Sequence, residues 1–114
     1  MQPKTPKLLD DVHDAAGFIL EAVRGKTLAD YHGDRILRQA LERNFEIIGE
    51  AMKRLAQYDP ETVARIGDHC QIIAFRNVLI HGYDLVHHQL VWSTIERQVP
   101  ARLRDVGALL GSTD

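Results

Sequence analysis

Cysteine is almost absent from this chain, and so are long apolar runs. Cys70 has no second cysteine with which to form an internal disulfide, which is typical of a reducing compartment. We predict that Cys70 is a small buried hydrophobic residue. No apolar run approaches the roughly 18 residues of a membrane span, and residues 1–11 lack the apolar centre of a signal peptide. We therefore expect a cytoplasmic protein that makes no membrane contact.

An excess of positive charge is also absent, because the net charge is -2. General nucleic-acid binders usually carry a basic excess that attracts the phosphate backbone. Residues 1–34 hold four Lys and Arg against six Asp and Glu, and the remainder holds ten against ten. Any contact with nucleic acid must therefore come from local arginines, or from a surface that more than one chain assembles.

The length of 114 residues fits one hydrophobic core, so we expect residues 1–114 to form a single domain. Its 45% hydrophobic and 26% charged content is ordinary for a globular protein and disfavours a disordered chain. The sequence contains no pattern typical of a strand pair, an internal repeat or a low-complexity tract. Helical spacing of apolar residues dominates instead.

The first half of the chain predicts two long helices. Thr5 is placed to cap the first helix, Pro6 to occupy its first position and Gly25 to stop it. Residues 26–33 predict a connection with one loose turn. The longest and most strongly patterned helix is expected from about residue 34 to residue 57.

The second half predicts a short turn at 60–66 and a third helix that begins at the cap Asp68 and ends at residue 81 or 83. A fourth helix is expected at 86–98. Pro100 predicts a kink or a fresh helix start in the last stretch. The predicted fold class is an all-α antiparallel bundle of four to five helices.

The third predicted helix contains the most unusual residues, namely Arg76, Asn77, His81 and Tyr83. Such polar groups are costly to bring near a core unless they are partnered, so their clustering needs a reason. An apolar arc formed by other residues of this helix faces away from Arg76, and it consists of Ile72, Phe75, Val78 and Leu79. The polar cluster is therefore predicted to lie away from the core of the bundle.

Arg76 and His81 do not face each other on one ideal helix. At about 100° per residue, they are separated by about 140° around the axis. The ridge beside them also carries Ile73 and Ile80, which would prefer burial in an interface. We therefore predict a homodimer in which a two-fold axis beside this helix brings two copies of Arg76 and His81 together.

Arginine and histidine without a metal suit the cleavage of RNA phosphodiesters. An imidazole that titrates near neutral pH can move the protons, and a guanidinium can bind the phosphate oxygens. Asn77 can orient either group. The 2′-hydroxyl of the RNA is the nucleophile, so no protein Ser or Cys is required.

Interpretations without catalysis stay open. Arg and His on the outer face of an amphipathic helix are often solvated or locally paired, and Tyr83 alone fits half-buried packing. Glu50 stands four residues before Arg54, which predicts an intrahelical ion pair.

A metal site would have to use the histidines at 69, 81, 87 and 88. His87 and His88 are adjacent and cannot share one helix face, and no carboxylate follows at a ligand spacing. We expect no metal and no cofactor.

The order of residues from Arg76 to Tyr83 resembles the signature of the HEPN superfamily, which is Arg, a polar residue, three more residues, His, one residue and Tyr. The match is closest to the HepT-like toxins of two-gene toxin–antitoxin modules. Residues 47–55 are similar to the second-helix motif of that family, and Val91-Trp92 is similar to its tryptophan after the signature. One departure is that residues 58–67 lack the proline- and tryptophan-containing lead-in of many relatives.

The resemblance implies an all-α, HEPN-like dimer that acts as a metal-independent endoribonuclease through a composite site. Arg76 and His81 then correspond to the catalytic pair and Asn77 to the supporting polar residue. The resemblance also implies a partner, an antitoxin nucleotidyltransferase of the MNT type that transfers AMP to Tyr83. The added phosphate would compete with RNA for Arg76. The alternative is a non-catalytic HEPN module that binds and supports a nucleotidyltransferase, which the near-neutral charge favours.

Overall fold

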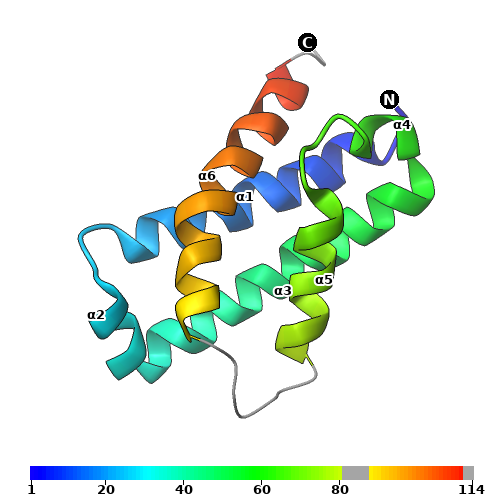
Figure 1. The fold of residues 1–114 in the computed structure, drawn as a ribbon. Helices are drawn as coiled ribbons and strands as arrows, with labels where there is room; N and C mark the ends of the chain where they lie inside the picture. The colour runs from blue at the N-terminus through cyan, green and yellow to red at the C-terminus, as the bar shows by residue number, and fades with distance from the viewer. Residues whose placement is uncertain (81–87, 112–114) are drawn as a thin grey trace.

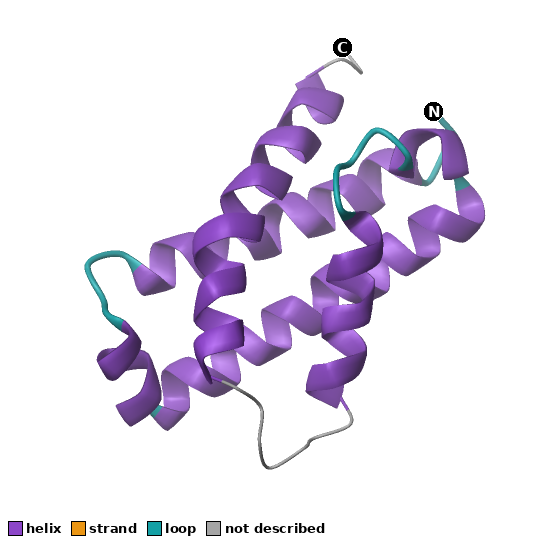
Figure 2. Ribbon diagram, viewed as in Figure 1, coloured by secondary structure: helices purple, strands orange, loops and turns teal. Residues whose placement is uncertain are grey.

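A computed structural model describes residues 1–80 and 88–111, and for residues 75–80 it describes the backbone alone. Every regular element within these ranges is a helix, as Figure 2 shows. The elements are α1 (Thr5–Val23), α2 (Leu28–Gly33), α3 (Arg35–Tyr58), α4 (Pro60–Val63), α5 (His69–Ile80) and α6 (His88–Gly111). The all-α prediction is confirmed. The described residues form six helices instead of four to five because two of the expected turns, α2 and α4, are short helices.

The four long helices are arranged around the pair formed by α1 and α3, which pack against each other along their lengths (Figure 1). Helix α6 packs against α1, and α5 packs against α3. The buried apolar side chains of all these helices form one core cluster, whose fully buried members include Leu9, Ile19, Leu41, Met52 and Val99. Within the described ranges, no helix is both long enough and apolar enough to cross a membrane.

The start of α1 differs from the prediction, because Lys4 and not Thr5 occupies the capping position. Thr5 is the first helical residue and is fully buried. Its hydroxyl donates a hydrogen bond of 2.7 Å to Oδ2 of Asp59, at the distant junction of α3 and α4. The threonine joins two helices instead of capping one. The predicted stop at Gly25 is confirmed, since its φ of 73° is one that glycine adopts without strain.

Helix α2 forms where the sequence predicts only a loose turn. The hydroxyl of Thr27 accepts a hydrogen bond from the backbone N–H of Asp30, and the Asp30 carboxylate accepts one from the backbone N–H of Thr27. This capping box satisfies two donors at the start of the helix. Tyr31 holds α2 to the core, because its side chain is fully buried and packs against the Trp92 ring of α6.

Helix α3 begins as predicted, with the Asp34 carboxylate accepting a hydrogen bond of 3.0 Å from the backbone N–H of Leu37. The intrahelical pair is also confirmed, because Nε of Arg54 lies 3.1 Å from Oε1 of Glu50. The helix ends at Tyr58, and the carboxylate of the next residue, Asp59, caps α4.

Helix α6 runs without a break through Pro100. Proline lacks an N–H group, and its ring collides with the carbonyl four residues earlier, so a bend is expected where it occurs inside a helix. Figure 1 shows the α6 ribbon changing direction about halfway along. The fresh start is therefore wrong and the kink is correct.

Candidate functional site

Helix α5 carries the first part of the predicted site. Arg76 and Asn77 lie on its C-terminal half, where the structure describes the backbone. His81 and Tyr83 lie outside the described residues, so their distances from Arg76 stay predictions. The structure shows how α5 is positioned and which surface lies beside it.

The buried face of α5 is set by Ile72, which is 3% exposed and belongs to the core cluster. Ile73 is partly buried and also packs against that cluster, so part of the apolar surface expected at a dimer interface is already covered within the chain. Cys70 is exposed, which makes its predicted burial wrong. Residues that are two positions apart in the sequence lie about 200° apart around a helix axis. Cys70 therefore points away from the core when Ile72 points into it.

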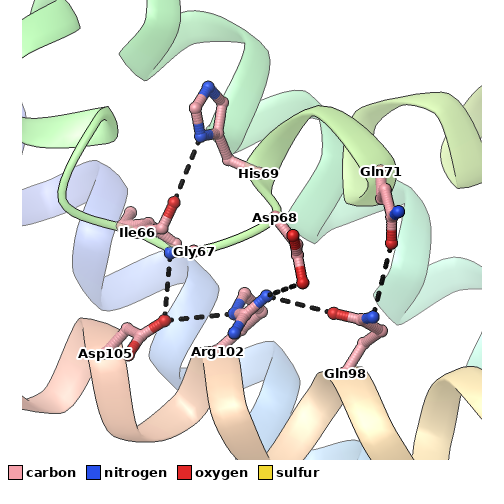
Figure 3. A network of polar contacts seen from close by, with 8 residues as sticks. All are labelled: Ile66, Gly67, Asp68, His69, Gln71, Gln98, Arg102 and Asp105. Atoms are coloured by element: carbon pink, nitrogen blue, oxygen red, sulfur yellow. Dashed lines mark hydrogen bonds and ion pairs between the residues drawn. The ribbon is translucent and has the colours of Figure 1, made fainter.

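The N-terminal end of α5 is tied to α6 through Arg102, whose side chain is only 11% exposed (Figure 3). Its Nη1 lies 3.3 Å from Oδ2 of Asp68 and donates a hydrogen bond of 3.0 Å to Oε1 of Gln98. Its Nε donates a hydrogen bond of 3.1 Å to Oδ2 of Asp105. The same carboxylate oxygen accepts a hydrogen bond from the backbone N–H of Gly67. One guanidinium therefore holds the loop before α5 against α6.

Asp68 precedes α5 as predicted, but its side chain pairs with Arg102. Its backbone has a φ of 52°, a left-handed conformation that Asp tolerates better than most residues. The backbone carbonyl of Asp68 accepts hydrogen bonds from the N–H groups of Gln71 and Ile72, which form the first turn of α5. A Cβ atom at Gly67 would lie 3.1 Å from Nη2 of Arg102, so this tight contact favours glycine.

A groove of about 370 Å³ lies between α5 and α6. Helix α5 contributes Gln71, Ile72 and Ala74, and α6 contributes Leu90, Ser93, Thr94, Arg97 and Gln98. Nε2 of Gln98 donates a hydrogen bond of 3.4 Å to Oε1 of Gln71 across the groove (Figure 3). The groove reaches Ala74, two residues before Arg76. It is therefore the surface hollow adjacent to the predicted catalytic part of the helix.

Two of the four histidines considered for a metal, His69 and His88, have other surroundings in the structure, and His81 and His87 lie outside the described residues. Nδ1 of His69 donates a hydrogen bond of 3.1 Å to the carbonyl oxygen of Ile66. The His88 ring packs edge-on against the rings of His32 and Tyr31, with centroids 4.7 Å and 5.4 Å away. Burial lowers the pKa of His88, and the nearby His32 and Arg38 lower it further. No group of three or more possible metal ligands occurs in the part of the chain that the structure describes.

Two features of the site region were absent from the sequence predictions. The Arg102 network was missed, although the three-residue spacing of Arg102 and Asp105 is a visible signal of an intrahelical pair. The groove and Arg97 were also missed. Their recognition requires knowing that α5 and α6 lie beside each other, which no short-range pattern reveals.

Comparison with known families gives a match over residues 12–106 to the family model described as "Ribonuclease HepT-like". A protein of Caldanaerobacter subterraneus subsp. tengcongensis, named "Putative RNase", is 32% identical over 108 residues, which is 94% of this chain and 96% of that protein. A protein of Thermococcus cleftensis, named "Probable ribonuclease HepT", is 30% identical over 97 residues, or 82% of this chain and 84% of that protein.

A protein of Methanocaldococcus jannaschii, also named "Putative RNase", is 26% identical over 98 residues, covering 86% of this chain and 89% of that protein. No solved structure matches the chain significantly. The match to the family model begins within α1, ends within α6 and spans the segment from Arg76 to Tyr83.

Proposed function

The chain belongs to the HepT-like ribonuclease family, and from this premise we propose that it is a metal-independent endoribonuclease, the toxin of a two-gene toxin–antitoxin module. The observation that carries the proposal is the family match across residues 12–106 in a chain that keeps Arg76, Asn77, His81 and Tyr83. We infer that residues 1–114 act as one domain. We also propose that the protein is cytoplasmic, because its proposed RNA substrate and nucleotide-using partner are both found there.

Arg76 and His81 are the catalytic residues in this proposal. The 2′-hydroxyl oxygen of a ribose attacks the adjacent phosphorus, and the bond from phosphorus to the 5′-oxygen breaks. A base takes the proton of the 2′-hydroxyl, and an acid gives a proton to the leaving 5′-oxygen. The products are a 2′,3′-cyclic phosphate and a 5′-hydroxyl. An imidazole can serve as base or acid, the Arg76 guanidinium binds the charged phosphate oxygens, and Asn77 orients these groups.

A homodimer supplies what one helix lacks. Arg76 and His81 diverge by about 140° on an ideal helix, so a partner helix related by a two-fold axis is the simplest way to place both on one phosphate. Two imidazoles in one composite site can also divide the roles of base and acid. Because one must be neutral and the other protonated, the cleavage rate should rise and then fall with pH around neutrality.

Cleavage of total RNA by the purified protein in the presence of a chelator tests the activity. We expect cyclic-phosphate ends from the wild type and a loss of about a hundredfold or more in rate for His81→Ala and for Arg76→Ala. Matched controls are His13→Ala and Arg104→Ala, which change exposed side chains on α1 and α6. Equal cleavage by the wild type and both site variants would remove Arg76 and His81 from the mechanism.

Tyr83 is the proposed point of control. The cognate nucleotidyltransferase directs the Tyr83 hydroxyl oxygen onto the α-phosphorus of ATP. A new bond from oxygen to phosphorus forms, pyrophosphate leaves and the phenolic proton is released. The attached phosphate then repels RNA and occupies Arg76. We expect the mass of AMP on a Tyr83 peptide after co-expression with the partner, and no such mass with Tyr83→Phe. Modification of another tyrosine would contradict the assignment.

A non-catalytic module that supports a nucleotidyltransferase is the second candidate, and the net charge of -2 favours it. Expression of the protein without its partner separates the two functions. Growth arrest that His81→Ala relieves supports the ribonuclease toxin, whereas harmless expression of the wild type supports the module.

A further inference from the structure

The groove between α5 and α6 is lined by one cation and by no carboxylate. Arg97 is the one charged side chain among its lining residues. The hollow between α1 and α3 contains three cations, of which Lys7 and Arg54 pair with Asp11 and Glu50. The third, Lys4, has its Nζ 6.0 Å from the centroid of the Tyr58 ring. The cation of Arg97 therefore lines a hollow to which no carboxylate contributes.

The sequence of α6 explains why Arg97 has no neighbour to neutralise it. Residues three or four positions away on a helix are the ones that form local ion pairs. For Arg97 these positions hold Ser93, Thr94, Pro100 and Ala101, none of which is acidic. Arg97 is exposed and makes no ion pair with the other described residues. Its donors are available to a ligand.

Polar and apolar side chains share the rest of the groove. The Thr94 hydroxyl donates its hydrogen bond to the carbonyl oxygen of Leu90, so this donor is not available to a ligand. Gln71 and Gln98 meet at 3.4 Å on an exposed rim, a weak contact that a ligand can replace. The Leu90 side chain is 47% exposed and supplies an apolar surface. A cation beside hydrogen-bonding groups and an apolar wall suits one stretch of single-stranded nucleic acid.

We propose that this groove binds the RNA strand beside the cleaved bond, with Arg97 holding a neighbouring phosphate. The proposal rests on the ribonuclease function and adds a binding residue to it. Gln71 and Ala74, which line the groove, are three residues apart on one face of α5, and the backbone position of Asn77 follows after three more. A strand in the groove therefore continues along the face of the helix that carries Asn77. A protein partner is a poorer fit, because a second copy docked here by symmetry presents the same groove and no carboxylate for Arg97.

The binding test uses the full-length His81→Ala protein, so that the RNA stays intact. A short fluorescein-labelled single-stranded RNA of mixed sequence is titrated against this protein and against versions that also carry Arg97→Ala, Arg97→Lys or Arg104→Ala. Arg104 is the matched control because it is an exposed arginine on the same helix and also lacks an acidic residue three or four positions away. It lines none of the grooves described above.

We expect Arg97→Ala to weaken RNA binding about tenfold and Arg104→Ala to change it less than about twofold. The slope of log affinity against log salt should fall by about 0.7 for Arg97→Ala, the value for one phosphate contact on a single strand. Arg97→Lys should retain most of the affinity. In the active protein, Arg97→Ala should raise KM and leave kcat unchanged, as expected for a contact made equally before and during the reaction.

Other outcomes overturn either this inference or the function beneath it. If the wild type cleaves RNA but Arg97→Ala binds as tightly as Arg104→Ala, the groove is not the subsite. If light scattering shows that Arg97→Ala converts a dimer to a monomer, the loss of RNA binding comes from the loss of the dimer, and the subsite assignment is also wrong. If Arg97→Ala weakens binding but the wild type cleaves no RNA, the groove stands and the ribonuclease function fails.

Discussion

Asp59 gathers more hydrogen bonds than any other carboxylate in the described residues. The hydroxyls of Thr5 and Thr62 each donate to Oδ2 at 2.7 Å, and the backbone N–H groups of Gln2 and Thr62 donate at 3.2 Å. The Thr5 hydroxyl is the largest cause of the lowered pKa of Asp59, followed by that of Thr62. The charged form of this side chain therefore joins the start of α1 to the junction of α3 and α4.

Acid should weaken this junction. A carboxyl group with a lower pKa in the folded than in the unfolded state adds stability above its unfolded pKa and loses it as the pH falls toward the folded pKa. For Asp59 that loss begins below about pH 4. We expect the Tm measured by circular dichroism to fall as the pH drops below about 4 and to continue falling toward about pH 2. Asp59→Asn should have a lower Tm at about pH 7 and a smaller further fall of Tm in acid.

A control at an exposed carboxylate makes this assignment specific. Asp10 lies exposed on α1, so Asp10→Asn should leave the fall of Tm in acid unchanged. Thr5→Val removes one buried hydrogen bond and should cost about 1 kcal/mol of unfolding free energy. An equal fall of Tm in acid for the wild type and for Asp59→Asn would contradict the role given to Asp59.

Helix boundaries were largely predictable because local signals set them. Asp34 before α3 and Gly25 after α1 act through their own backbone and side chain, so the sequence is sufficient. Thr5 was misassigned because its partner Asp59 is 54 residues away, and no local pattern reports such a contact. Helix α2 was underestimated because its stability comes from burial of Tyr31 as well as from its caps.

The residues of the candidate site could be predicted from the sequence, but the surface that surrounds them could not. Arg76 and Asn77 were assigned to a helix, and the structure places both in α5. The Arg102 network and the Arg97 groove depend on how α5 and α6 lie relative to each other, which is a property of the packing around α1 and α3. Local periodicity predicts which face of a helix is apolar, but it does not identify the neighbouring helix.

At the scale of the whole molecule, charge and assembly are linked. A net charge of -2 gives little general attraction for RNA, so binding has to rely on a few arginines whose donors are not already occupied. Arg102 is occupied by Asp68, Gln98 and Asp105, whereas Arg97 is exposed and has no such partner among the described residues. In the dimer proposed above, the second chain would supply further cations to the same RNA strand.

The composite site makes a quantitative prediction for mixed dimers. Arg76→Ala and His81→Ala are each expected to be inactive alone. If each site takes Arg76 from one chain and His81 from the other, a mixed dimer has one intact site and one site that lacks both residues. After complete subunit exchange at equal concentrations, about half of the dimers are mixed, so about a quarter of the wild-type cleavage rate should return.

The same mixture separates this arrangement from two others. A site that needs both His81 imidazoles has only one of them in a mixed dimer, so its rate also stays at the level of the separate variants. If Arg76 and His81 of a single chain act together, no chain in the mixture holds both residues and the rate stays at the level of the separate variants. A mixture of His81→Ala with itself, treated identically, controls for the exchange procedure. Light scattering of each sample shows whether dimers persist, so that a missing recovery is attributed to site architecture only when dimers are present.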